Sequence, residues 1–132
     1  MKILCSYCSG PKRSDKRPLP AINRYRSERL RDLCRRGQAR GTPLYILSGH
    51  FGLLAAADPI PWYDHLLSPD EAEALSRDVA HRLRELGVTD VEYHTADVGL
   101  TPPVRPYLAA IAAACTVAGV CLTVINLDGD PS

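Results

Sequence analysis

The chain has no apolar segment long enough to cross a bilayer and no apolar stretch of the kind found in a signal peptide. Its longest apolar run, near Leu108–Ala118, is short and rich in alanine. The start, Met1-Lys2-Ile3-Leu4, becomes polar at Ser6. We therefore expect a cytoplasmic protein with no membrane partner.

A disulfide framework is also not expected, because the five cysteines are odd in number and follow no secretion signal. Cys5 and Cys8 have the CxxC spacing of a redox pair or half a zinc site, but no second CxxC and no HxxxH follow. Cys34, Cys115 and Cys121 fall in apolar patterns that predict core positions. We expect neither a metal nor a cofactor.

The net charge of +1 is the sum of two oppositely charged parts. Residues 1–40 hold 12 of the 16 Lys and Arg but only 3 of the 15 acids, which gives +9 and leaves −8 on the remainder. Such asymmetry indicates an anionic ligand at one end of the molecule. The alternative is a solvated basic face paired with an acidic one.

Hydrophobic periodicity predicts alternating strands and helices over the single domain 1–132. The clearest helix starts at Ser68-Pro69-Asp70-Glu71, a capping-box pattern. Gly37 is the expected end of the helix before it. This order favours a three-layer α/β sandwich with a central, mostly parallel four-stranded sheet. The expected strands are 2–5, 43–48, 88–94 and 120–127, and the expected helices are 21–36, 69–86 and 104–118.

Ligands of such sheets bind beyond the carboxyl ends of the strands. Here these ends lead into three segments predicted as loops, 6–20, 49–67 and 95–103. His94, Asp97, Arg105 and Tyr107, at or beyond the third of these ends, form a weaker candidate set, in which His94 faces the same cleft and Asp97 caps a turn.

The first loop contains Cys8, Ser9, Gly10, Lys12 and Arg13. Glycine and serine beside cations can hold a phosphate through backbone N–H groups, although the Walker spacing and the dinucleotide fingerprint are absent. The cations also favour a thiolate, which makes Cys8 a candidate nucleophile. The alternative is a surface turn with an unreactive thiol.

The second loop has two candidate segments. In Ser48-Gly49-His50-Phe51, the imidazole can act as a general acid or base, and Phe51 either stacks on a base or fills the core. In the segment 58–65, Asp64 can activate water or stabilise a sugar cation, and Tyr63 can stack on a base. Alternatively, Tyr63 anchors the loop while Asp64 caps a turn.

Four motifs follow one another over residues 3–67: Cys8-Ser9-x-x-Lys12, Pro20-Ala21-x-x-x-Tyr25-x-Ser27, Ile46-Leu47-Ser48-x-x-x-Gly52-Leu53 and Ile60-x-x-Tyr63-Asp64-x-x-Leu67. This series resembles a group of uncharacterised bacterial domains, whose pattern reads Ser-Cys-Ser-x-Lys-Lys, Pro-Ala-x-x-Leu-Tyr-x-Ser, Ile-Leu-Ser-Ala-x-x-Gly-Leu, Ile-x-x-Tyr-Asp-x-x-Leu. The chain departs from that pattern at Tyr7, Arg24 and Gly49, and it has one extra residue before Lys12.

Those domains look related to the YaaA-like peroxide-stress proteins and to the lysine-transferring domain of archaeosine synthase, and more distantly to the uracil-DNA glycosylase-like fold. The resemblance implies an α/β sandwich with a pocket for a nucleobase. By motif position the pocket would be lined by Cys8, Ser9, Lys12, Tyr25, Ser27, Ser48, Tyr63 and Asp64. The glycosylases' water-activating motif is absent, so their chemistry is not implied.

The sequence thus predicts an enzyme acting on a nucleobase, nucleoside or nucleotide, most simply by cleaving or exchanging an N-glycosidic bond. The catalytic candidates are Cys8, Ser48, His50 and Asp64. The binding candidates are Ser9, Gly10, Lys12, Arg13, Tyr25, Arg26, Ser27, Gly49, Phe51 and Tyr63, with the phosphate on Lys12, Arg13 and Arg26. The alternatives are a non-catalytic DNA- or RNA-binding stress protein, cysteine-dependent transfer to a modified base, and a redox sensor. The sequence leaves the oligomeric state open, a homodimer included.

Overall fold

The computed structural model describes residues 1–127 and has a central five-stranded sheet of order β4-β3-β1-β6-β7. All neighbouring strands are parallel except the pair β3 and β4. The α/β class with a mostly parallel sheet is therefore confirmed, with one strand more than expected. The strands of this sheet are β1 (Lys2–Tyr7), β3 (Leu44–Ser48), β4 (Gly52–Ala55), β6 (Asp90–Thr95) and β7 (Cys121–Asn126).

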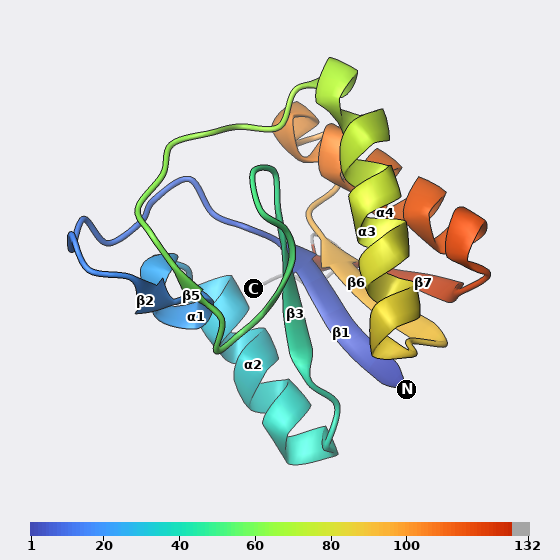
Figure 1. Ribbon diagram of the computed structural model, residues 1–132, viewed down its shortest axis with the longest axis horizontal. Coiled ribbons are helices and arrows are strands. Elements are labelled where there is room, and N and C mark those ends of the chain that lie inside the picture. The colour runs from blue at the N-terminus through green and yellow to red at the C-terminus, as the bar shows by residue number, and fades with distance from the viewer. Residues whose placement is uncertain (128–132) are drawn as a thin grey trace.

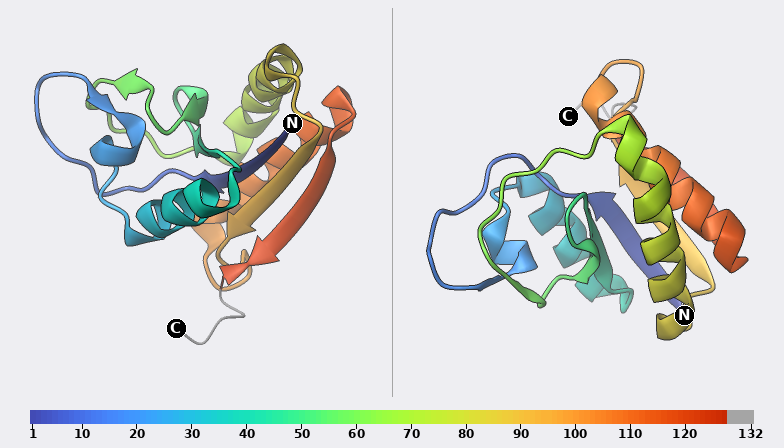
Figure 2. Two further views of the ribbon diagram at one scale, coloured as in Figure 1. Left: turned by 90° about the horizontal axis from the view of Figure 1, so that it is seen from below. Right: turned by 45° about the horizontal axis from the view of Figure 1, so that its top comes forward.

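The helices lie in layers on the two faces of the sheet (Figure 1, Figure 2). The helix α2 (Glu28–Arg40) lies on one face, where its Gly37 packs near Leu4 of β1. The helices α3 (Ala72–Leu86) and α4 (Arg105–Ala118) pack together on the other face. Since both of its faces are covered, β1 is an almost continuous apolar strand, as its sequence Lys-Ile-Leu-Cys suggests.

The strand β1 occupies the topological switch point of the sheet. The chain leaves β1 toward β3 on one side, whereas β6 pairs with β1 on the other side. At such a point the connections diverge and leave a crevice beyond the carboxyl end of the strand. The segment that follows Tyr7 therefore starts at the place where a ligand is expected.

The prediction that residues 49–67 form a purely irregular loop is wrong. Residues 52–55 of this segment form β4, which follows a tight turn over residues 49–51 and pairs antiparallel with β3, and Gly52, the first residue of β4, has φ of +79°. Farther along, β5 (Pro59–Ile60) pairs with β2 (Leu19–Pro20) from the first loop. Backbone pairing thus joins the two segments that were expected to form the site.

The predicted helix 21–36 is also wrong, because the chain breaks it into α1 (Ala21–Arg24) and α2. Tyr25 is extended, and the Ser27 hydroxyl then accepts the Leu30 N–H as the cap of α2. Gly37 does not end the helix, which continues to Arg40 and stops at Gly41. Gly37 is instead required because a Cβ there would lie 2.3 Å from the Thr42 carbonyl oxygen.

The other helices follow their sequence signals closely. Before α3, a 3₁₀ turn spans Pro69–Glu71, and the Glu71 carboxylate accepts the Ser68 N–H at 2.9 Å. Gly87 ends α3 with φ of +71°. A second 3₁₀ turn, Pro102–Val104, leads into α4. None of the described helices is both long and apolar enough to cross a bilayer.

Of the three cysteines predicted in the core, Cys115 is buried, Cys34 is half-buried and Cys121 is exposed, so the prediction is wrong for Cys121. Cys5 and Cys115 are buried, and burial raises the pKa of both, to about 11 for Cys115. Cys121 is exposed, because it lies on the edge strand β7, and Cys34 is half-buried. The predicted strand 120–127 ends in the structure at Asn126, and the polar tail 128–132 lies outside the described residues.

Candidate functional site

Arg24 holds the basic loop after β1 in a fixed course. Its side chain is fully buried and donates to the carbonyl oxygens of Arg13, Asp15 and Arg17, at 2.6, 3.0 and 2.7 Å. A fourth bond, of 3.2 Å, reaches the Ile60 carbonyl oxygen. One guanidinium thereby fastens the first loop to the second. Sequence reasoning did not select Arg24 as a site residue, although arginine stands there in place of the leucine of the domains that the motifs resemble.

Backbone pairing supports the same loop closer to β1. Lys12 forms an isolated antiparallel bridge with Tyr25. The Arg13 N–H donates to the Arg24 carbonyl at 2.8 Å, and the Arg26 N–H donates to the Pro11 carbonyl at 2.9 Å. These bonds bring the cations of the loop and of the α1–α2 connection together.

A pocket of about 210 Å³ opens beyond the carboxyl end of β1. Five predicted site residues line it, namely Cys8, Ser9, Gly10, Lys12 and Asp64. Tyr107, from the weaker candidate set, lines it too, and the structure adds Tyr7, His65, Leu66, Pro103 and Val104. Cys8 and Asp64, predicted from separate loops, therefore share one cavity.

The predicted residues Tyr25, Ser48 and Tyr63 form a buried hydrogen-bonded network behind this pocket. Tyr63 Oη lies 2.5 Å from Tyr25 Oη and 2.9 Å from Ser48 Oγ. The same Ser48 hydroxyl accepts the His50 and Phe51 N–H groups. Burial raises the pKa of Tyr25 to about 12 and that of Tyr63 still further. The network thus holds neutral hydroxyls that position the loops, and Ser48 is fully buried away from the cavity.

The ring of Tyr63 is already covered by its neighbours. The Lys12 ammonium lies 4.6 Å from the ring centroid, His50 stacks on the ring at 5.4 Å, and Phe51 meets it edge-on at 5.0 Å. Because only 8% of Tyr63 is exposed, the ring positions Lys12 better than it could receive a base. Phe51, at 37% exposure, is the more open aromatic side chain.

Cys8 contacts Tyr107 and shares its pocket with His65, and sequence reasoning combined neither with the thiol. Its thiol donates to Tyr107 Oη at 3.7 Å, and the Leu67 N–H donates to the same oxygen at 3.2 Å. His65 lines the same pocket, and its Nε2 lies 3.1 and 2.9 Å from the two Glu71 oxygens. A thiol and an imidazole therefore line one cavity, and the Glu71 carboxylate outside its lining orients the imidazole. These are the groups used in nucleophilic cysteine catalysis.

Arg29 supports the pocket from behind and is the second residue that sequence reasoning missed. Its guanidinium donates to Ser6 Oγ at 2.6 Å, to the Tyr7 carbonyl at 2.9 Å and to the Cys8 carbonyl at 3.3 Å. It also lies 3.8 Å from the Tyr7 ring centroid. Arg29 thereby fixes the backbone that presents Cys8. Its sequence position, in the first turn of an arginine-rich helix, gives no signal of this role.

A basic hollow of about 370 Å³ adjoins the pocket, and Lys12 lines both. The hollow is lined by Lys12, Arg13, Ser14, Asp15, Arg26 and Arg31. Arg13 pairs with Asp15 at 3.0 Å and Arg31 with Glu28 at 2.8 Å, so their charges are partly compensated. The predicted phosphate contacts Lys12, Arg13 and Arg26 therefore converge.

The remaining predicted residues lie at the edges of the site. The Ser9 hydroxyl lines the pocket and donates to the Pro11 carbonyl. Gly49 packs against Leu67 and Tyr107, since a Cβ there would lie 3.0 Å from Leu67 Cβ and 3.1 Å from Tyr107 Oη. Ser27, as the cap of α2, uses its hydroxyl within the helix.

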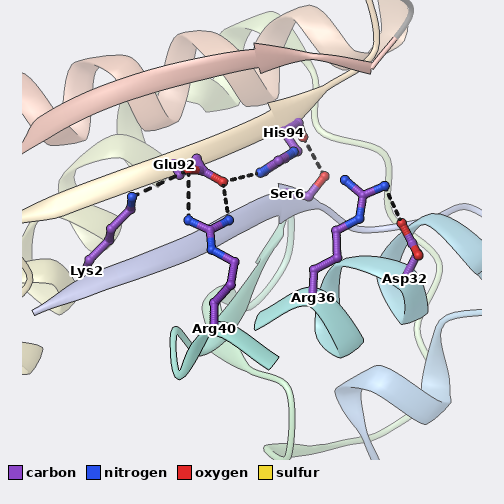
Figure 3. Close-up of polar contacts among 7 residues, drawn as sticks. All are labelled: Lys2, Ser6, Asp32, Arg36, Arg40, Glu92 and His94. Atoms are coloured by element: carbon purple, nitrogen blue, oxygen red, sulfur yellow. Dashed lines mark hydrogen bonds and ion pairs between the residues drawn. The ribbon is translucent and has the colours of Figure 1, made fainter. Parts of the chain in front are cut away.

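The prediction that His94 faces the same cleft is wrong. His94 projects from the α2 side of the sheet, where its Nε2 bonds Glu92 at 2.7 Å (Figure 3). The Glu92 carboxylate also pairs with Arg40 and Lys2. The pKa of Glu92 is lowered to about 2, mainly by its hydrogen bond to the Arg40 guanidinium and also by His94.

Asp97 caps a turn, as expected, by accepting the Gly99 and Leu100 N–H groups.

No group of three or more His, Cys, Asp or Glu side chains suited to a metal ion occurs within residues 1–127. Comparisons with protein-family models, with curated proteins and with solved structures give no significant match.

Proposed function

We propose that the protein is an enzyme that acts on a nucleotide, with the base and sugar in the pocket beyond β1 and the phosphate in the adjoining basic hollow. The observation that carries the proposal is the position of Lys12, which lines both cavities. One cation can then hold the phosphate beside the reacting groups Cys8 and Asp64. The four motifs that resemble nucleobase-handling domains support the same substrate class, and on them we also propose a uracil-DNA glycosylase-like fold.

The reaction that we put first is hydrolysis of the N-glycosidic bond. The exposed Asp64 carboxylate in the pocket can orient a water molecule or stabilise the sugar cation. The bond between the anomeric carbon and the base nitrogen breaks, its electrons leave with the base, and water supplies hydroxide to the sugar and a proton to the base. Phosphate binding on Lys12 fixes the sugar for this step.

A second chemistry is favoured by the groups around Cys8. With His65 taking its proton, the Cys8 thiol can add to a nitrile carbon on a base, and the same proton passes to the nitrile nitrogen to give a thioimidate. An amine then displaces the thiol and leaves an amidine, so that the cysteine is regenerated. Glu71 holds the imidazole for this role at 2.9 Å.

Calorimetric titration with nucleobases, nucleosides and nucleoside monophosphates tests the binding proposal. We expect monophosphates to bind most tightly, Lys12→Ala to weaken binding at least tenfold, and Lys16→Ala to leave it unchanged. Lys16 is the matched control because it is exposed in the same loop but lines neither cavity. Equal binding of nucleosides and monophosphates would contradict the phosphate site.

Chromatography of the products then separates the two chemistries. Hydrolysis predicts release of free base that Asp64→Asn abolishes, with Asp70→Asn as an exposed control outside the pocket. Cysteine chemistry predicts that Cys8→Ala abolishes turnover, whereas Cys34→Ala does not. Undiminished turnover in Cys8→Ala excludes the covalent route.

A further inference from the structure

An apolar groove of about 680 Å³ lies between the first turns of α3 and α4. The two helices begin at the same end of the molecule (Figure 1, Figure 2). The groove is lined by Leu66, Leu67, Ser68, Pro69, Ala72, Pro102, Pro103, Arg105, Pro106 and Ala109. The space exists because alanines, at positions 72 and 109, stand where the helices would otherwise place larger side chains.

The backbone of this groove is set before any ligand arrives. Pro69 opens the 3₁₀ turn before α3, and Pro102 and Pro103 belong to the one before α4. Proline rings fix φ, so these turns lose little conformational freedom when a ligand binds. Leu66 at the rim is 65% exposed, so its apolar side chain is accessible to a ligand that enters the groove.

The groove is continuous with the candidate site. Leu66 and Pro103 line both the groove and the pocket that contains Cys8 and Asp64. At its other side that pocket shares Lys12 with the basic hollow. The basic hollow, the pocket with Cys8 and Asp64, and the apolar groove therefore adjoin one another in that order.

The sizes of the spaces indicate what occupies them. Pockets for small molecules usually measure about 300 to 1,000 Å³. The central pocket, at about 210 Å³, is smaller than that range, whereas the groove beside it lies within it. A ligand that filled only the pocket and the basic hollow would leave the apolar groove next to the reacting groups exposed to water.

From this arrangement, and resting on the proposed function, we propose that the substrate is a nucleotide bearing an apolar alkyl or aryl substituent, and that the substituent occupies the groove between α3 and α4. The phosphate lies in the basic hollow and the reacting bond beside Cys8 and Asp64. The groove thus selects substituted nucleotides over the common unsubstituted ones.

Calorimetry with paired ligands tests this assignment. The pairs are adenosine and guanosine monophosphates and the same nucleotides carrying a benzyl group on the base, and benzyl alcohol is the probe without a nucleotide. Burial of about 60 Å² of the benzyl group tightens Kd roughly tenfold. We expect at least one benzylated nucleotide to show this gain over its parent.

The variant Ala109→Trp fills the groove and is expected to abolish the gain while leaving the Kd of the parent nucleotide within twofold. The matched control is Ala113→Trp, the same change one helical turn along α4, at an exposed position outside the groove. We expect Ala113→Trp to keep the full gain. Circular dichroism melting of both variants checks that each folds.

Each remaining outcome decides the question. Equal Kd values for benzylated and parent nucleotides, or a gain that survives Ala109→Trp, overturn the groove assignment and leave the proposed function standing. Binding of benzyl alcohol as tight as that of the benzylated nucleotide overturns the assignment of a nucleotide substituent. Failure of every nucleotide to bind refutes the proposed function itself.

Discussion

Replacement of Arg24 by leucine is predicted to release the basic loop without unfolding the sheet. Arg24 donates three of its four hydrogen bonds to carbonyls of residues 13–17. Hydrogen bonds from a charged donor contribute about 1.5 to 3 kcal/mol each, and the buried leucine returns about 1 to 2 kcal/mol. At the lower end of these ranges, three bonds less the leucine contribution lower the free energy of opening the loop by about 3 kcal/mol, which raises the open population roughly 150-fold.

Limited trypsin digestion measures this opening, because cleavage after Lys16 requires the loop to leave its bound course. When opening and closing are fast, the cleavage rate follows the open population. Arg24→Lys keeps the charge but loses the planar guanidinium, so an intermediate rate is expected. Arg26→Leu is the control, since Arg26 is exposed and its side chain makes none of these bonds. A cleavage rate in Arg24→Leu within twofold of the wild-type rate would refute the reasoning.

Three further outcomes are expected. Because the folded-state pKa of Glu92, about 2, lies below its ordinary value of 4.5, with Arg40 as the main cause, its stabilisation is present above about pH 5 and is lost as the pH falls toward 2. Urea unfolding should show Glu92→Gln less stable than wild type by about 2 kcal/mol at neutral pH and almost equal to it near pH 2; a constant difference contradicts this. Although alanine favours helices, Gly37→Ala should lower the free energy of unfolding by about 2 kcal/mol, because its Cβ would lie 2.3 Å from a carbonyl oxygen. The control Gly10→Ala should change the free energy of unfolding little, because nothing lies within 4 Å of its Cβ. A stabilised Gly37→Ala variant would show that the contact relaxes freely. Iodoacetamide should modify the exposed Cys121 first, and the thiol buried in β1 only on unfolding, as peptide mass mapping can show.

Sequence reasoning reached much of the fold because the signals for its long elements are local. The apolar stripe, the capping box and the terminal glycine of α3 all lie within one segment, and the structure shows α3 where those signals place it. The break between α1 and α2 was missed because Tyr25 is helical in periodicity but extended in the fold, where it pairs with Lys12 across the loop.

The residues of the candidate site likewise fall into those that local sequence indicated and those that it did not. Local sequence indicated Cys8, Lys12 and Asp64, since each lies in a polar segment beyond a strand, and these three line one pocket. It did not indicate Arg29, because that role depends on the carbonyls of Tyr7 and Cys8, more than twenty residues away in the chain.

By itself the sequence determined the alternation of strands and helices and the cationic character of the segment after β1, because periodicity, caps and charge are properties of neighbouring residues. Only the tertiary structure decided that the basic loop is fastened by Arg24, that Ser48 is buried, that His94 faces away and that an apolar groove adjoins the pocket. Those features depend on which distant backbone groups need hydrogen-bond partners and on how closely two helices can pack, and neither is encoded in a local pattern.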